Sequence, residues 1–539
     1  MSSPNTQPPP PSDQAEPYGL RSLWSPYLKS PLRNYPCRWE GEIGELIVFG
    51  EIPKEINGTF YRIMADPFYE AEPDVPIEGD GNVSAFRIHN GRVEMKVKYV
   101  DTERLRLERA AGKRLFGLYR NPFSHHPCVQ AAIDSTANTN LVFWAGKLLA
   151  LKESALPYYL EPNTLETLGY DAFGSPSGAK TFSAHPKSDP YTNELVVYGY
   201  EARGLNTLDI VIYSIDEYGK HSDVQWIKSP WISFIHDCAI TENFIILNVW
   251  PFEARSTERL KAGKQPHWVW NKNRPAAFIV APRRPARAVA PGWEPSEHRI
   301  YEWDTCVAMH TSSAWEERTV DGKVKLFMES SRVMYNMLPF CEPSAEEVEE
   351  IGVSPNPHQE FHADYARWEF DLSQPTGTRI ADPHIVLDVA SEFPRMDERF
   401  MTRNFNWAVT PVILPGTEGV VVPPHLNGLA MIETKTGSTR YFNPGEGCHM
   451  PEPVFIPRSE DSPEGDGWVM AMVQRMAENI SELVLLDTKT FETPTAVIRL
   501  PFQLTNQIHG NWVEGSKIGA YQSLVREIKK LNTPQPNID

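Results

Sequence analysis

Proline and glycine interrupt this chain throughout its length, and they constrain its fold more than any other feature. The 539 residues include 48 prolines and 33 glycines, and the prolines are spread over the whole sequence. Proline removes a backbone donor and clashes inside a helix, so prolines at this density argue against long helices. They favour many short strands joined by tight turns.

Short strand-like runs fill the intervals between these breaks. The apolar run 83–88 is followed by Asn90-Gly91 and a second run from Arg92, which predicts a β-hairpin. Residues 140–151 show another strand–turn–strand pattern. Further strands are predicted at 45–50, 58–62, 194–200, 208–214, 244–249, 277–280, 325–328, 366–370, 419–422, 467–472, 482–486 and 495–500. Helices are expected only in two inserts, at 253–263 and 344–350.

Many short strands with few helices are typical of an all-β barrel, sandwich or propeller. Over a chain of this length, a β-propeller protects its sheet edges best within a single unit, so we predict a propeller. Residues 1–17 are rich in proline and serine, and we expect them to form a disordered tail. We expect residues 18–539 to form one domain.

Charge and cysteine content narrow the class of protein. The net charge is −18 and no Lys/Arg-rich run stands out, which argues against nucleic-acid binding. The six cysteines form no C-x-x-C pair, which indicates a reduced, cytoplasmic setting. The first residues do not have the pattern of a signal peptide, and no window reaches the ~18 apolar residues of a membrane-spanning helix.

Four of the fifteen histidines stand beside strand-like runs that suit an inward-pointing imidazole: His185, His236, His310 and His509. They lie far apart in the sequence, unlike the closely spaced ligands of a zinc finger. A propeller can bring such residues together, because each innermost strand offers a residue to the central axis. Four neutral imidazoles suit a borderline metal such as Fe(II), Zn or Cu. Spacing alone does not select these four, since a single histidine is more often a surface or core residue.

The sequence around these histidines resembles the metal-binding motifs of the carotenoid cleavage oxygenase superfamily. The motifs are Ala184-His-Pro-Lys-x-Asp-Pro190, His236-Asp with Ile240-Thr241, His310 with Ala314-x-Glu-Glu317, and His509-Gly-x-Trp-Val513. Supporting segments are Gly58-x-Phe-Tyr-Arg62, Gly79-Asp-Gly81, Phe393-Pro-Arg395 and Glu452 to Arg458. The similarity runs from about residue 40 to 515. It implies a seven-bladed β-propeller with Fe(II) on its axis, held by the four histidines below a dome of helices and loops.

The same resemblance implies that three glutamates orient iron-binding histidines: Glu153, Glu392 and Glu452. A carboxylate that accepts the second ring N–H of a ligand fixes its tautomer and raises its basicity. Glu452 lies in a proline-bounded apolar run and Glu153 precedes Ala155-Leu-Pro157, and neither setting is typical of a solvated surface.

Tyr119 and Lys152 make the chain most similar to the stilbene-cleaving branch, the lignostilbene and resveratrol dioxygenases. In that branch a tyrosine and a lysine at matching positions hold the 4′-hydroxyl of the substrate. An ammonium and a hydroxyl stabilise a phenolate, which pushes electron density into the central alkene. We therefore expect Tyr119 and Lys152 to bind and activate the substrate. The alternative for Lys152 is a salt bridge to Glu153 or simple exposure.

The resemblance implies an Fe(II)-dependent dioxygenase that uses O2 to cleave the interphenyl double bond of 4′-hydroxystilbenes. Resveratrol and piceatannol would be the leading substrates, each giving two aromatic aldehydes. The alternatives are an apocarotenoid oxygenase with the same iron site and a non-catalytic, protein-binding propeller. The chain departs from the wider family at Met64-Ala-Asp-Pro67, Met309, Ser313 and Trp315. These departures affect packing and pocket shape, so the resemblance does not identify the exact substrate.

Overall fold

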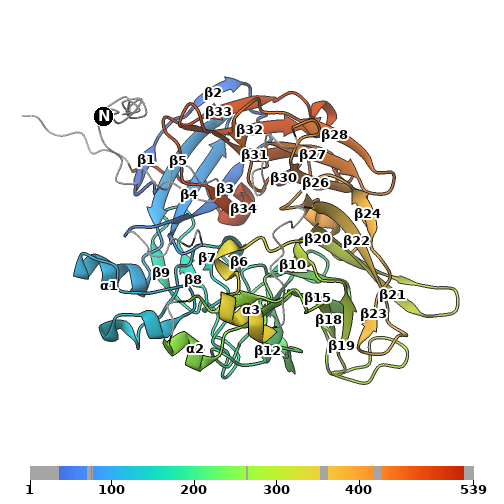
Figure 1. Cartoon of the computed structure of the whole chain (residues 1–539). Helices are drawn as coiled ribbons and strands as arrows, with labels where there is room; N and C mark the ends of the chain where they lie inside the picture. The colour runs from blue at the N-terminus through green and yellow to red at the C-terminus, as the bar shows by residue number, and fades with distance from the viewer. Residues whose placement is uncertain are drawn as a thin grey trace, which may run out of the picture.

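The computed structural model describes residues 36–69, 75, 77–262, 265–351, 362–417 and 426–526. The predicted tail at 1–17 and the predicted strand at 419–422 therefore lie outside the described residues. Seven largely antiparallel sheets stand side by side in a ring (Figure 1). This arrangement confirms the predicted all-β propeller with seven blades.

The first four blades contain most of the strands in the first half of the described chain, together with β34 and β23 from later in the sequence. Blade 1 contains β34 (Gln507–Glu514), β3 (Gly58–Asp66), β4 (Asp80–His89), β5 (Arg92–Tyr99) and β1 (Gly41–Ile43). Blade 2 contains β6 (Asn140–Trp144), β7 (Lys147–Leu151), β8 (Tyr158–Leu160) and β9 (Thr167–Tyr170). Blade 3 contains β10 (Lys187–Asp189), β11 (Glu194–Gly199), β12 (Asp209–Asp216) and β13 (His221–Lys228). Blade 4 contains β14 (Cys238–Ile240), β15 (Phe244–Val249), β18 (Ala276–Pro282), β19 (Arg299–Trp303) and β23 (Thr378–Arg379).

The other three blades complete the ring. Blade 5 contains β20 (Val307–Arg318), β21 (Val324–Val333), β22 (Ala363–Asp371) and β24 (His384–Leu387). Blade 6 contains β25 (Arg395–Met396), β26 (Trp407–Val412), β27 (Gly428–Glu433) and β28 (Ser438–Phe442). Blade 7 contains β29 (Cys448–His449), β30 (Val454–Pro457), β31 (Gly467–Arg475), β32 (Ile480–Asp487), β33 (Ala496–Arg499) and β2 (Ile47–Gly50).

Two strand pairings join the beginning of the described chain to its end. β34 pairs with β3, with Gly58 opposite Glu514, and β2 pairs with β33, with Ile47 opposite Arg499. Figure 1 shows these blue and red strands side by side. Because each pairing places strands from both chain ends in one sheet, the ring is closed by hydrogen bonds rather than by a covalent link.

The innermost strands contact one another around the axis. β34 contacts β6, β10 contacts β14, β14 contacts β20, β20 contacts β25, β25 contacts β30, and β30 contacts β34. Between β6 and β10, the side-chain amide of Asn140 donates to the carbonyl of Ala184 at 2.9 Å. Residues at these strands from distant parts of the sequence therefore face a common centre.

The described chain has four α-helices: α1 (Glu103–Ala111), α2 (Thr257–Ala262), α3 (Ala345–Ile351) and α4 (Gly515–Ile518). α2 and α3 fall in the two predicted inserts, although the first insert begins with β16 (Phe252–Ala254), which pairs with β17 (Trp268–Trp270). The expectation that helices occur only in these inserts is wrong, because α1 lies elsewhere. Thr102 Oγ1 accepts from the Leu105 N–H, and Gly112 ends α1 with φ 66°, so the sequence carries both capping signals.

Some of the segments outside the blades contact one another. The 3₁₀ turns are η2 (Pro122–Ser124), η3 (Pro127–Val129), η4 (Pro339–Cys341), η5 (Glu398–Phe400) and η6 (Thr488–Thr490). α2 contacts η2, and β17 contacts η4. The Asn121 side chain, which caps η2, donates to the carbonyls of Leu260 and Gln265 at 3.2 and 2.9 Å. The segment 119–124 is thereby fixed against the insert that contains α2.

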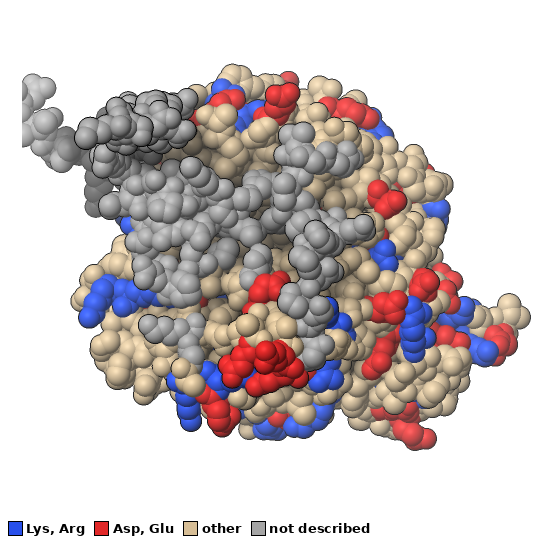
Figure 2. Space-filling model, viewed as in Figure 1, with Lys and Arg blue, Asp and Glu red and all other residues tan. Residues whose placement is uncertain are grey.

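None of the six cysteines, all within the described residues, forms a disulfide. Within the described residues, no helix has the length and apolar character needed to cross a membrane. Acidic and basic side chains are interspersed on the described surface seen in Figure 2, without a continuous basic face there.

Candidate metal centre

The four predicted histidines meet at the centre of the ring. His236 Nε2 lies 3.1 Å from both His185 Nε2 and His310 Nε2. The ring of His509 lies 4.5 Å from that of His185 and 4.7 Å from that of His310, centroid to centroid. One nitrogen from each of the four rings falls within a single group whose atoms all lie within 4.8 Å of one another. His185, His310 and His509 are buried, and the His236 side chain is 11% exposed.

Each histidine lies at or near the beginning of an innermost strand, and that strand positions it. His185 and His236 lie two residues before β10 and β14, and His509 lies within β34. His310 lies within β20, between Ala308 and Thr311, where the pairing with β21 shifts register. Such an irregularity turns a side chain away from the regular alternation of a strand. It places His310 among the other three imidazoles.

The three predicted glutamates each hold the second ring nitrogen of a different histidine. Glu153 Oε2 lies 2.8 Å from His236 Nδ1, and Glu392 Oε2 lies 2.7 Å from His310 Nδ1. Glu452 Oε1 lies 3.3 Å from His509 Nδ1. A carboxylate accepts the Nδ1–H, which leaves the lone pair of each ring on Nε2, directed to the centre. The geometry therefore presents Nε2 lone pairs to an ion.

Basic neighbours keep two of these carboxylates ionised despite their burial. Burial alone opposes the charge on Glu153, but His236 and Lys152 lower the pKa of that carboxyl. For Glu452 burial has the same effect, and Arg395 and His509 hold its pKa well below the usual range. The Gly510 N–H also donates to Glu452 Oε2 at 3.1 Å. Anionic carboxylates around the imidazoles raise the basicity of the metal-facing nitrogens.

The residues present fit a transition-metal ion. Two metal–nitrogen bonds of about 2.0–2.1 Å at a right angle place their nitrogens about 3 Å apart, and the two shortest Nε2–Nε2 distances are 3.1 Å. His509 Nε2 is buried and has no hydrogen-bond partner among the described residues. An unpaired buried nitrogen is costly unless it binds something, and a metal ion satisfies it.

A second group of possible ligands is less suitable. His362, Asp364 and Asp388 also bring their donor atoms together. Asp364 is already engaged by both the Nε and Nη2 atoms of Arg332, at 3.0 and 2.5 Å. The guanidinium neutralises the one buried carboxylate of this group, so it offers little attraction to a cation.

Tyr119 and Lys152 lie together beside the metal centre. The Tyr119 hydroxyl donates to Glu153 Oε1 at 2.9 Å, while the other oxygen of that carboxylate holds His236. Lys152 Nζ lies 4.9 Å from the centre of the Tyr119 ring and donates to Asn138 Oδ1 at 3.1 Å. Burial lowers the pKa of Lys152 to about 8, although Glu153 opposes this shift. Lys152 is therefore not exposed, and its hydrogen bonds go to Asn138 Oδ1 and, at 3.4 Å, to the Ile77 carbonyl rather than to Glu153.

Sequence reasoning does not single out two residues that support this pair. Glu78 accepts from the Tyr119 N–H and forms an ion pair with Arg114 at 2.6 Å. Asn138 holds Lys152 through its oxygen and donates to the Gly79 carbonyl at 2.6 Å. For Glu78 the sequence does offer one signal, because this residue directly precedes the motif Gly79-Asp80-Gly81.

Comparison with known proteins places this geometry in a family. The family model for retinal pigment epithelial membrane protein matches residues 34–514. The chain is 55% identical over 525 residues to resveratrol cleavage oxygenase 1 of Botryotinia fuckeliana (strain B05.10), covering 97% of this chain and 92% of that one. It is 35% identical to isoeugenol monooxygenase of Pseudomonas putida, covering 89% of this chain and 96% of that one.

A solved structure agrees with these relatives. The crystal structure of Pseudomonas brassicacearum lignostilbene dioxygenase superposes with a TM-score of 0.80 and 34% sequence identity, covering 89% of this chain and 97% of that chain. Family match, relatives and fold converge on one group. The chain belongs to the carotenoid cleavage oxygenase family, in the branch that contains resveratrol cleavage oxygenase and lignostilbene dioxygenase, and it is an oxygenase.

Proposed function

We propose that this protein is an Fe(II)-dependent dioxygenase that cleaves the interphenyl Cα=Cβ bond of 4′-hydroxystilbenes with O2. One observation carries the proposal: Glu153 joins a phenol-binding pair to a four-histidine centre, because its two oxygens hold the Tyr119 hydroxyl and His236 Nδ1. Glu153 would thereby fix the position of the substrate's phenol relative to the imidazole of His236. The products would be two aromatic aldehydes.

The proposed roles follow from the contacts. His185, His236, His310 and His509 would hold the iron through Nε2, and Glu153, Glu392 and Glu452 would orient three of them. An all-nitrogen neutral ligand set leaves the ion its full charge. Fe(II) in such a site supplies the binding and activation of O2.

Lys152 and Tyr119 would bind and ionise the 4′-hydroxyl of the substrate. Lys152 lies buried beside Tyr119 with a pKa of about 8, so near that pH a share of it is the neutral amine. This amine can take the phenolic proton at Nζ and then, as the ammonium, pair with the phenolate. The phenolate pushes electron density through the ring into the alkene and stabilises positive charge beside the bond to be cleaved. The relatives fit this chemistry, since resveratrol and isoeugenol are both phenols conjugated to an alkene.

An apocarotenoid substrate fits the same residues less well. Lys152 is 5% exposed, and burying an ammonium costs several kcal/mol unless a partner compensates it. A hydrocarbon chain gives this ammonium no partner, whereas a phenolate does. A non-catalytic propeller would have no use for four converging imidazoles with an unpaired buried Nε2. Both alternatives are therefore weaker than the phenolic stilbene.

We also propose a cytoplasmic location. Six cysteines without a disulfide suit a reducing compartment, where thiols stay unpaired.

The direct test uses protein loaded anaerobically with Fe(II) and then exposed to O2 and resveratrol. We expect equal amounts of 4-hydroxybenzaldehyde and 3,5-dihydroxybenzaldehyde by liquid chromatography, and no aldehydes from Zn-loaded protein. An apocarotenal is assayed in parallel. If the protein binds no iron, the enzyme proposal is wrong. If the iron-loaded protein cleaves the apocarotenal and leaves resveratrol intact, the proposed substrate is wrong.

A further inference from the structure

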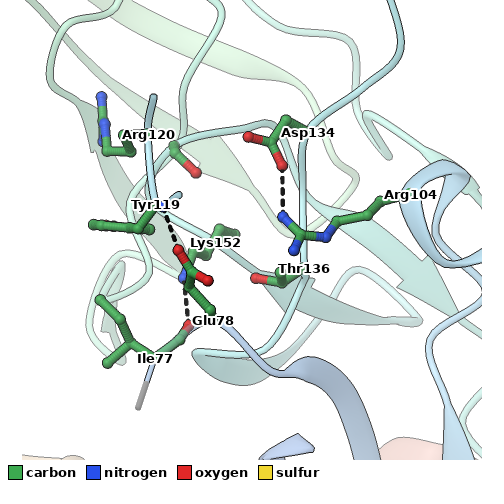
Figure 3. A pocket seen from close by; sticks show the side chains of 9 residues that line it. Ile77, Glu78, Arg104, Tyr119, Arg120, Asp134, Thr136 and Lys152 are labelled. Carbon is green, nitrogen blue, oxygen red and sulfur yellow. Dashed lines mark hydrogen bonds and ion pairs between the residues drawn. The ribbon is translucent and has the colours of Figure 1, made fainter. Parts of the chain in front are cut away.

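A small polar pocket lies beside the phenol-binding pair and is separate from the four histidines. Tyr119 and Lys152 line it, together with Glu78, Arg104, Asp134 and Thr136, and none of the four histidines does (Figure 3). Its free space is about that of one water-sized group. The pocket therefore adjoins the proposed substrate site on a side that the four histidines do not line. It has room for one further oxygen atom.

Thr136 presents an unpaired hydroxyl to this pocket. The residue is 4% exposed, and its Oγ1 is buried without a hydrogen-bond partner among the described residues. Figure 3 shows this oxygen on the side that faces Glu78 and Lys152. A buried hydroxyl without a partner is energetically unfavourable, so it points to a ligand oxygen that completes it.

The backbone around Thr136 is held on both sides. The Gly81 N–H donates to the Thr136 carbonyl at 2.8 Å, and Ala137 adopts φ 44°. Two residues on, the Asn138 side chain donates to the carbonyls of Ile77 and Gly79 at 2.9 and 2.6 Å. A left-handed alanine between two anchored residues leaves little freedom for this segment. Thr136 is thus presented to the pocket by a rigid segment.

The charged neighbours in the pocket are already engaged. Arg104 Nη1 donates to Asp134 at 2.9 Å, and Glu78 is paired with Arg114 at 2.6 Å. Lys152 Nζ has Asn138 Oδ1 as an acceptor and would face the 4′-oxygen of the substrate. The Thr136 hydroxyl is an uncharged buried group of this pocket without a partner among the described residues, and it can both donate and accept a hydrogen bond.

We propose that Thr136 recognises a second hydroxyl on the phenol ring, ortho to the 4′-hydroxyl, and so selects catechol-type stilbenes. The inference rests on the proposed function, because Tyr119 and Lys152 must first hold the 4′-oxygen beside the pocket. Hydroxyls on adjacent ring carbons lie within hydrogen-bond distance of each other, so the second oxygen reaches the same pocket. One water-sized space admits a hydroxyl.

The test compares piceatannol with resveratrol, which differ only by this 3′-hydroxyl. We expect Fe(II)-loaded wild type to have a kcat/KM for piceatannol about 3–10 times that for resveratrol, the range of one net hydrogen bond. Thr136→Val, which keeps the shape and removes the hydroxyl, should bring that ratio close to one by lowering the kcat/KM for piceatannol. Thr136→Ser should restore it. Thr434→Val, a buried threonine in another blade whose hydroxyl bonds Phe405 O, is the matched control and should keep the wild-type ratio.

A measurement on wild type alone guards against a misfolded variant. 3,4-Dihydroxybenzaldehyde should inhibit resveratrol cleavage at about 3–10-fold lower concentration than 4-hydroxybenzaldehyde. Equal inhibition, an unchanged substrate ratio in Thr136→Val, or an equal fall for both substrates would each overturn the role of Thr136. In all these outcomes resveratrol is still cleaved by the wild type. If neither stilbene is cleaved, the proposed function itself fails, and this inference fails with it.

Discussion

Lys152 is the residue at which the proposed chemistry and the stability of the fold make opposite demands. Burial lowers its pKa from 10.5 to about 8, so the charged form is less favourable in the folded protein than in the unfolded chain. Between those two values the folded state binds fewer protons, and stability rises with pH. The penalty is fully present below about pH 8. In the proposed function this penalty is useful, because the phenolate of the substrate needs a cation beside it.

Replacement of Lys152 should therefore uncouple stability from activity. Lys152→Met keeps the volume and removes the charge, and we expect the free energy of unfolding at pH 7 to rise by about 1–3 kcal/mol. Resveratrol cleavage should fall at least ~100-fold while bound iron is unchanged. Chemical denaturation and metal analysis check both, with the exposed Lys54→Met as the control. A destabilised Lys152→Met protein that loses iron would assign Lys152 a structural role instead.

The carboxylates behind the imidazoles give a separate prediction on metal affinity. Glu392 accepts from His310 Nδ1 at 2.7 Å and from its backbone N–H at 3.1 Å. We expect Glu392→Gln to weaken iron binding roughly 10–100-fold, because the amide no longer fixes the tautomer or raises the basicity of the ring. Titration of the apoprotein with Fe(II) under anaerobic conditions measures the Kd. Exposed Glu51→Gln is the matched control, and an unchanged Kd in Glu392→Gln would contradict the orienting role.

Much of the site could be predicted at the level of the residue, but only with the family resemblance. Local context suggested inward-facing histidines, yet nothing in their spacing joined His185 to His509, since the contact depends on ring closure. Glu78 and Asn138 could not be assigned, because their roles depend on contacts with Tyr119 and Lys152 across loops. Pair interactions between distant segments are set by the tertiary fold rather than by local pattern.

At the scale of the element, the loop that contains Thr136 and Asn138 is shaped by its contact with β4. A Cβ on Gly81 would lie 2.2 Å from the Ala137 carbonyl oxygen and 2.8 Å from that of Thr136. These are backbone atoms and cannot turn aside, so only glycine permits this approach. The placement of Lys152 through Asn138 depends on this close contact.

Gly81→Ala should accordingly damage both the fold and the site. We expect a loss of about 2–4 kcal/mol in the free energy of unfolding, through backbone displacement. The kcat/KM for resveratrol should fall as well, because Asn138 moves with the loop. Gly44→Ala is the control, since its nearest contact is an ordinary 3.9 Å to a Val525 methyl group. Equal stability of the two variants by denaturant titration would show that the loop has more freedom than its contacts indicate.

Hairpins that are marked by a turn sequence are predicted correctly, whereas strand pairings between distant parts of the chain are not. Asn90-Gly91 joins β4 and β5, and the pattern at 140–151 corresponds to β6 and β7. Helix α1 is not predicted although Thr102 and Gly112 mark its ends, because the prolines and glycines spread along the chain argue against helices in general. The pairing of β2 with β33 has no local signal at all, since it joins segments from opposite ends of the chain.

In the molecule as a whole, the four-histidine site depends on the closure of the ring, because one of its histidines lies on the closing strand. His185, His236 and His310 come from blades 3, 4 and 5, whereas His509 lies on β34, the strand that closes blade 1. An ion bound by all four ties the closing blade to the opposite side of the ring. Metal that binds only the folded protein also stabilises it by mass action.

Iron should thus stabilise the whole fold in a concentration-dependent way. At free Fe(II) about 100 times its Kd, we expect the unfolding free energy to exceed that of the chelator-treated protein by about 2.7 kcal/mol. Denaturation midpoints at several iron concentrations under anaerobic conditions measure this dependence. His509→Ala should reduce the dependence strongly. Midpoints that do not move with iron in the wild type would mean that the four histidines do not hold the ion in solution.

In the proposed function, a phenol held by Tyr119 and Lys152 directs cleavage at the four-histidine centre. This is tested by comparing kcat/KM of the Fe(II)-loaded protein for resveratrol and for 4′-O-methylresveratrol, which cannot form the phenolate. We expect the methyl ether to be cleaved at least ~100-fold less efficiently, in line with the loss of one key electrostatic contact. Cleavage of both compounds at equal efficiency would contradict it.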